Sequence, residues 1–118
     1  MIPVAETKIL KNIQYTKLTP SEYGLIKFAD TKTAIIYGVY PANALESDAT
    51  VSGGYKHRID LSAYNLTGYL WGAVIYQYGQ GYPEAPTYRD FDTTGITLLS
   101  KVNAVNVKLY WIVIGTYS

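Results

Sequence analysis

The closing segment, from Lys101 to Ser118, constrains the fold more than any other part of the chain. Apolar residues occupy alternate positions along it, namely Val105, Val107, Leu109, Trp111 and Val113. Side chains two residues apart lie on the same face of a strand, so this period predicts a β-strand with one buried face. The other face begins polar and ends apolar, at Tyr110, Ile112 and Ile114. A strand that is apolar on both faces is covered by a second sheet or by another chain.

Other segments of the chain also predict strands. Thr33 to Tyr40 carries apolar residues on both faces and ends at Pro41, as expected of a central strand. Leu66 to Tyr78 predicts a buried strand, in which Gly68 and Gly72 mark a bulge or the close approach of a backbone or ring. The remaining predicted strands are Leu25 to Phe28, His57 to Leu61 and Gly95 to Ser100. Since no helices alternate with them, we predict an all-β fold, an antiparallel β-sandwich or jelly roll in a single domain.

The length of 118 residues suits one domain. We expect residues 19–118 to form the sandwich and residues 1–18 to form an extended N-terminal arm that pairs with another subunit, although the pattern of this arm also fits a helix loosely. Two turn-rich segments, Asn43 to Gly54 and Gly79 to Thr94, predict long loops. The two tryptophans, Trp71 and Trp111, are expected in the core.

The composition argues against several classes of function. A net charge of +1 provides no basic surface for nucleic acid. Cysteine is absent, which excludes disulfides and thiolate chemistry. The start of the chain lacks the pattern of a signal peptide, and the longest apolar run, Tyr69 to Tyr76, is too short to span a bilayer. We therefore expect no nucleic-acid partner and no membrane insertion.

Residues suited to catalysis or metal binding are few. His57 is the single histidine, and nothing in its neighbourhood resembles a catalytic triad. Glu84, Asp90 and Asp92 are close in sequence and could bind calcium, but their spacing does not match an EF-hand. Two loop carboxylates could also serve glycoside hydrolysis, although the sequence gives no separation between them. We expect a protein that is not an enzyme and that holds no cofactor and no metal.

The segment Gly79 to Thr94 is the best candidate for a ligand site, because it combines aromatic, acidic and basic side chains. Tyrosine offers a rigid contact surface for a sugar ring, and carboxylates and arginine bind sugar hydroxyls. In the alternative interpretation, these tyrosines cover the edge of the core or a subunit contact. The candidate residues in and beside this segment are Tyr78, Tyr82, Tyr88, Arg89, Asp90 and Asp92.

The closing motif Val105-x-Val107-x-Leu109-x-Trp111-Ile112-Val113-Ile114-Gly115 resembles the ends of bacteriophage tail-fibre and baseplate tip domains. It is also similar to the ends of H-type lectin-like sandwiches. The resemblance implies a compact β-sandwich, usually a homotrimer, that attaches a virion to glycans or proteins on the host surface. A head-fibre or capsid decoration protein is the alternative setting within a virion.

These observations together predict a non-enzymatic virion protein that assembles as a homo-oligomer, with a trimer favoured. Tyr110, Ile112 and Ile114 are the predicted subunit contact, and the Gly79 to Thr94 segment is the predicted receptor site. The expected partners are other virion proteins and a host-surface glycan or protein, with carbohydrate favoured. The alternative is a purely structural capsid or tail decoration protein that binds no ligand.

Overall fold

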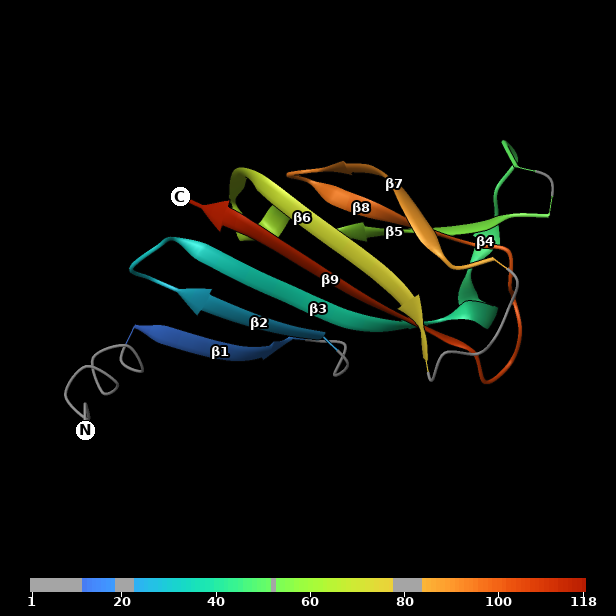
Figure 1. Cartoon of the computed structure of the whole chain (residues 1–118), viewed down its shortest axis with the longest axis horizontal. Helices are drawn as coiled ribbons and strands as arrows, with labels where there is room; N and C mark the ends of the chain where they lie inside the picture. The colour runs from blue at the N-terminus through green and yellow to red at the C-terminus, as the bar shows by residue number, and fades with distance from the viewer. Residues whose placement is uncertain (1–11, 19–22, 52, 78–83) are drawn as a thin grey trace.

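Two antiparallel β-sheets build the protein in the computed structural model, which describes residues 12–18, 23–51, 53–77 and 84–118 (Figure 1). The five-stranded sheet has the order β1 (Ile13–Leu18), β2 (Tyr23–Phe28), β3 (Thr33–Pro41), β9 (Lys108–Tyr117) and β6 (Leu66–Tyr76). The four-stranded sheet has the order β4 (Glu46–Ser47), β5 (Tyr55–Asp60), β8 (Gly95–Ser100) and β7 (Thr87–Asp92). Two single-turn 3₁₀ helices, Ala42–Ala44 and Ser62–Tyr64, lie in connections. The predicted antiparallel β-sandwich is confirmed.

The core lies between the two sheets, because each sheet turns one apolar face toward the other. Strand β9 pairs with both β3 and β6, and its inward residues Leu109, Trp111 and Val113 are buried. The period predicted for the closing segment is therefore correct from Val107 onward. Val105 is 70% exposed, because it precedes the strand and lies in the connection that leads into it. The largest fully buried side chains are Trp111, Ile36, Ile59, Leu61, Ile96, Leu98, Leu109 and Val113.

Strand β6 departs from the sequence prediction, because it is buried on one face only. It forms an edge of the five-stranded sheet, and Trp71 is 63% exposed, so the prediction that this residue is in the core is wrong. The register of β6 against β9 shifts on both sides of Gly68, as the prediction of a bulge requires. At Gly72, a Cβ atom would lie 2.8 Å from Cε2 of Phe91, which confirms the close approach of a ring.

Both predicted long loops contain strands. Residues Thr87–Asp92 form β7, which pairs with β8 and turns much of the predicted Gly79 to Thr94 loop into sheet. A short strand, β4, lies within the predicted Asn43 to Gly54 loop. An alternation of polar and apolar residues is enough to form an edge strand when a neighbour such as β8 supplies the backbone partners.

The predicted N-terminal arm is described only from Asn12 onward, and residues 1–11 lie outside the described part of the chain. Within it, Ile13–Leu18 is extended as expected, but its strand partner is β2 of the same chain. This part of the arm therefore belongs to the five-stranded sheet and forms its outer edge (Figure 1). No helix in the described ranges has the length and hydropathy needed to cross a bilayer.

Candidate functional site

The described residues of the predicted ligand site lie on β7, and they do not converge on one point. Tyr88 pairs in register with Leu98, whose side chain is fully buried, so both lie on the face toward the core. Arg89 pairs with Thr97 on the opposite, outer face of the same sheet. The ring of Tyr88 packs edge to face on Phe91, with centroids 5.5 Å apart. The other two predicted tyrosines, Tyr78 and Tyr82, lie outside the described residues.

Arg89 is held by an ion pair within the chain. Its Nη1 atom lies 2.8 Å from Oδ2 of Asp48, and the Asp48 side chain is only 1% exposed. The same Nη1 donates to the Thr50 hydroxyl at 3.0 Å, and Nε lies 3.4 Å from the Asp90 carboxylate. Hydrogen bonds from the Thr50 hydroxyl and amide, followed by the contacts with Arg89, lower the pKa of Asp48 to about 2. The arrangement fastens the segment after β4 to the outer face of the four-stranded sheet.

Asp92 also makes its contacts within the chain. Its Oδ1 atom accepts a hydrogen bond from the Thr94 amide at 2.8 Å and lies 3.3 Å from Nη2 of Arg58. Arg58 in turn donates to the Asp90 carbonyl at 2.6 Å and to the Thr97 hydroxyl at 3.2 Å. Bonds from Thr94, with a smaller contribution from Arg58, lower the pKa of Asp92. The predicted acidic and basic residues thus tie β5 and β7 together across β8.

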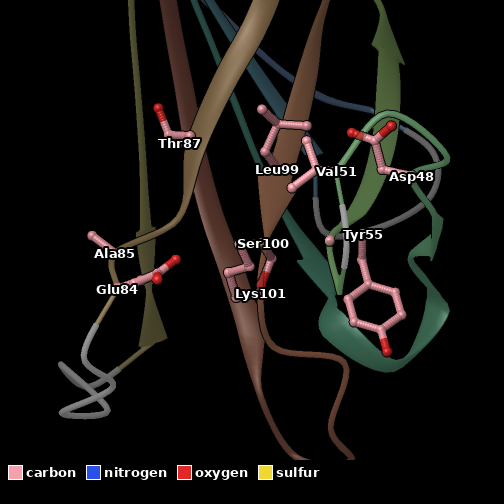
Figure 2. A pocket seen from close by; sticks show the side chains of 10 residues that line it. Asp48, Val51, Tyr55, Glu84, Ala85, Thr87, Leu99, Ser100 and Lys101 are labelled. Carbon is pink, nitrogen blue, oxygen red and sulfur yellow. The ribbon is translucent and has the colours of Figure 1, made fainter.

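A cavity of about 230 Å³ opens beside the Asp48–Arg89 pair, between the segment after β4 and the start of β7. Figure 2 shows Glu84 on one side of the cavity and Tyr55 on the other, with Ser100 and Lys101 between them. This volume is below the range of about 300–1,000 Å³ that is typical of sites for drug-sized ligands. The cavity therefore suits a small group, such as a single sugar ring or one side chain.

The three residues predicted at a subunit contact share the outer face of the five-stranded sheet. Tyr110 and Ile112 are each 38% exposed, and Ile114 is half-buried. Residues paired in register lie on the same face, so the ladder places apolar neighbours beside them in three cross-strand rows. The first row is Tyr15, Ile26, Ile35, Ile114 and Trp71; the second is Gly24, Tyr37, Ile112 and Ala73, and continues to Lys17 on β1; the third is Val39, Tyr110 and Ile75.

Most of this outer face was not identified from the sequence. Trp71, Ile75 and Tyr15 are 63%, 59% and 59% exposed, and they extend the face across both edges of the sheet. The alternation of Trp71, Ala73 and Ile75 on β6 was a usable signal, but the apolar residues between them made the whole strand resemble a buried one. Two-sided apolar strands were correctly found at β3 and β9; their outer faces are covered by no element among the described residues.

Nothing in the described ranges brings together three or more histidine, cysteine, aspartate or glutamate side chains as a metal site would. His57 stacks on the ring of Tyr40, with centroids 3.8 Å apart and planes 11° apart. Burial lowers the pKa of His57 below 6.5, and the negative charge of Glu46 opposes the shift in part. The stacked and half-buried histidine is part of the packing around β3 and β5.

Availability to another molecule differs among the β7 residues, the small cavity and the outer face. The β7 charges are bonded internally, the cavity is small, and the outer face is extended, apolar and exposed. No protein-family model matches the sequence, and no curated protein matches it significantly.

Proposed function

We propose that this chain is a non-enzymatic structural protein of a virion, and that it works as a subunit which buries the outer face of its five-stranded sheet in an assembly. The observation that carries the proposal is this face itself. Over β2, β3, β9 and β6, the three central rows contain no charged residue, and Lys108 lies beyond them at one end of the face, opposite Pro41. Antiparallel sheets that face water usually carry polar residues on that side. Extended apolar surfaces on soluble proteins mark sites of interaction with other proteins.

The virion setting rests on the closing motif that ends in Trp111, Ile112, Val113, Ile114 and Gly115, which resembles the ends of phage tail-fibre and baseplate tip domains. The outer face explains why the motif is apolar at consecutive positions. Trp111 and Val113 fill the core, while Ile112 and Ile114 supply the middle of the outer face. One strand thus stabilises the subunit on one side and offers a contact surface on the other.

Binding of a host-surface carbohydrate is the second candidate function, and the cavity beside Tyr55 favours it. The residues that line the cavity include Tyr55, Glu84 and Lys101, whose side chains carry an aromatic ring, a carboxylate and an ammonium, groups that suit a sugar ring and its hydroxyls. Glycan-array binding that is lost in a Tyr55→Ala variant and kept in a Tyr69→Ala variant would support this function. Tyr69 is a suitable control because it is 80% exposed and does not line the cavity. Equal binding by both variants would exclude the cavity.

Incorporation into particles tests the structural proposal. Virions produced with the wild-type chain should contain it when they are purified and examined by mass spectrometry. A Trp71→Lys variant should be lost from the particles, because it places a charge in a surface that becomes buried. A Val105→Lys variant should be retained, because Val105 is 70% exposed and lies off the outer face. Absence of the wild-type chain from particles would contradict the proposal.

A further inference from the structure

We infer that the outer face of the five-stranded sheet is covered by a second copy of this chain, packed face to face in a two-fold symmetric dimer. This inference rests on the proposed function and names the partner of the same surface. Three properties of the face support it: the absence of charged residues from its centre, its area, and the different relief of its two halves.

The electrostatics of the face favour an identical partner. In a two-fold dimer, the same residues approach one another from both sides, so a charged face would repel its own copy. Across β2, β3, β9 and β6, the three rows contain aliphatic and aromatic residues with Gly24, and no acidic or basic residue. The charged positions of this face lie at its margins: Lys17 continues the second row on β1, and Lys108, opposite Pro41, lies beyond the third row on β9. Depletion of charge and enrichment of Tyr and Trp are typical of the centres of protein interfaces.

The size of the face also matches a dimer contact. Strands lie about 4.8 Å apart and alternate residues of a strand about 6.7 Å apart, so the three rows, of five, five and three positions, cover about 420 Å² of flat area. Two such faces in contact bury about 840 Å² of flat area, and a specific protein interface buries about 1,000 Å² or more of accessible surface. The flat area underestimates the accessible area, because Tyr15, Trp71 and Ile75 project from the sheet with more than half of their surface exposed.

The two halves of the face differ in relief. On the β1–β3 side, the ring of Tyr37 lies across Gly24, and its hydroxyl meets the Tyr15 hydroxyl at 3.2 Å. These two rings fill that half. On the β9–β6 side, a hollow of about 140 Å³ lies against Ala73, Ile75, Tyr110 and Ile112. One half is therefore filled by aromatic rings and the other is hollowed.

The difference in relief is complementary when the two-fold axis of the dimer runs parallel to the strands and close to β3. Rotation about it sets the filled half of each copy against the hollowed half of the other, with β1 opposite the partner's β6. The row that begins at Tyr15 and ends at Trp71 then meets itself in reverse, and Ile35 lies opposite its own copy. Such a contact closes at two copies. The inference thus gives a dimer in place of the trimer favoured from the sequence.

Sedimentation of the full chain tests self-association. The wild-type chain should have twice its monomer mass at micromolar concentration. Ile75→Glu should raise the dissociation constant about a hundredfold or more, because two unpaired carboxylates would be buried in each dimer. Val105→Glu is the matched control and should leave the dissociation constant unchanged, since Val105 is 70% exposed in a connection. Far-ultraviolet circular dichroism and thermal unfolding of each variant show whether the fold is retained.

Cross-linking tests the geometry without removing a large part of the face. The chain contains no cysteine, so a single introduced thiol reports on one position. An Ile35→Cys variant treated with a short bis-maleimide should give a covalent dimer in high yield, because sheets packed face to face lie about 10 Å apart. A Val105→Cys variant should give little covalent dimer under the same conditions.

Three outcomes overturn the inference, and each is distinct from failure of the proposed function. A wild-type chain that stays monomeric at high concentration overturns the dimer, but it can still enter virions through another protein. A chain of higher mass that neither cross-links through Ile35→Cys nor responds to Ile75→Glu associates through a different surface, and a trimeric mass also overturns the two-fold contact. Failure of the proposed function is instead read from particles that lack the chain.

Discussion

Asp48 and Arg89 form an ion pair of 2.8 Å over the outer face of the four-stranded sheet, and the Asp48 side chain is almost completely buried. Asp48 follows β4 and Arg89 lies on β7, so the pair connects the two opposite edges of this sheet. Thr50 donates both its amide and its hydroxyl to the same carboxylate, at 3.0 Å and 2.7 Å. The contact holds the segment after β4 against the strands.

This contact predicts that the protein loses stability in acid. The pKa of Asp48 is lowered from 3.8 to about 2 in the folded state, first by Thr50 and then by Arg89. Because the folded pKa is below the unfolded one, the contribution of Asp48 is fully present above pH 3.8 and is lost as the pH falls toward about 2. An Asp48→Asn variant should have a lower Tm at neutral pH and a flatter dependence of Tm on pH in this range. An unchanged acid profile in thermal scans would contradict the role of Asp48.

The stacked pair of His57 and Tyr40 predicts a second pH dependence. Burial lowers the pKa of His57 below 6.5, so the unfolded chain takes up the proton first as the pH falls. Stability should therefore decrease below pH 6.5 and level off once the folded state is also protonated. As the single histidine, His57 gives one set of ring resonances in a proton NMR titration. A midpoint at or above 6.5 would be inconsistent with this packing, and a His57→Phe variant should lack the dependence.

Gly38 is predicted to tolerate no side chain. A Cβ atom at this position would lie 2.6 Å from Cζ2 of Trp111, and the indole ring is buried. A Gly38→Ala variant should lose about 1–3 kcal/mol of unfolding free energy in urea titrations, since an overpacked core forces rings and backbone to shift. Combining it with Trp111→Leu should cost less than the sum of the two single substitutions, because the shorter side chain frees space. Strict additivity would show that the two residues are not in conflict.

The two tryptophans should differ in their response to a soluble quencher. Trp71 is 63% exposed and Trp111 is 2% exposed. A Trp71→Phe variant should therefore emit at shorter wavelength and resist quenching by iodide, while a Trp111→Leu variant that remains folded should be quenched several-fold more strongly. For the wild-type chain, quenching should weaken as the protein concentration rises and the outer face becomes covered. Quenching that is independent of concentration would show that Trp71 stays in water.

The extent to which the sequence predicts this fold depends on how many faces of a strand are buried. In β9, the apolar residues Leu109, Trp111 and Val113 alternate with more polar residues near the start of the strand. The inward face could therefore be identified from the sequence. In β6, both faces are apolar, and the period cannot distinguish a face covered by the core from one exposed at the surface. The exposed position of Trp71 follows from its place opposite Ile114 on the uncovered outer face and from the register shift at Gly68, neither of which is a local property.

The candidate site was predictable only in part, for a related reason. Arg89, Asp90 and Asp92 were found as a cluster of charge, but their partners Asp48 and Arg58 are more than thirty residues away in the chain. Pairing over such a distance depends on the sheet topology. The same cluster that suggests a ligand site in the sequence therefore becomes a set of internal contacts once β5, β7 and β8 are assembled.

The position of β9 between β3 and β6 has a consequence for folding. It is the last strand of the sandwich in chain order, yet it lies inside the five-stranded sheet and supplies backbone partners to both neighbours. During synthesis, β3 and β6 therefore emerge with open hydrogen-bonding edges, and they remain so until β9 leaves the ribosome. Non-local pairing of this kind slows folding and leaves strand edges free to pair with other chains. A nascent chain stalled before β9 should be a substrate for chaperones, whereas the completed sandwich should not.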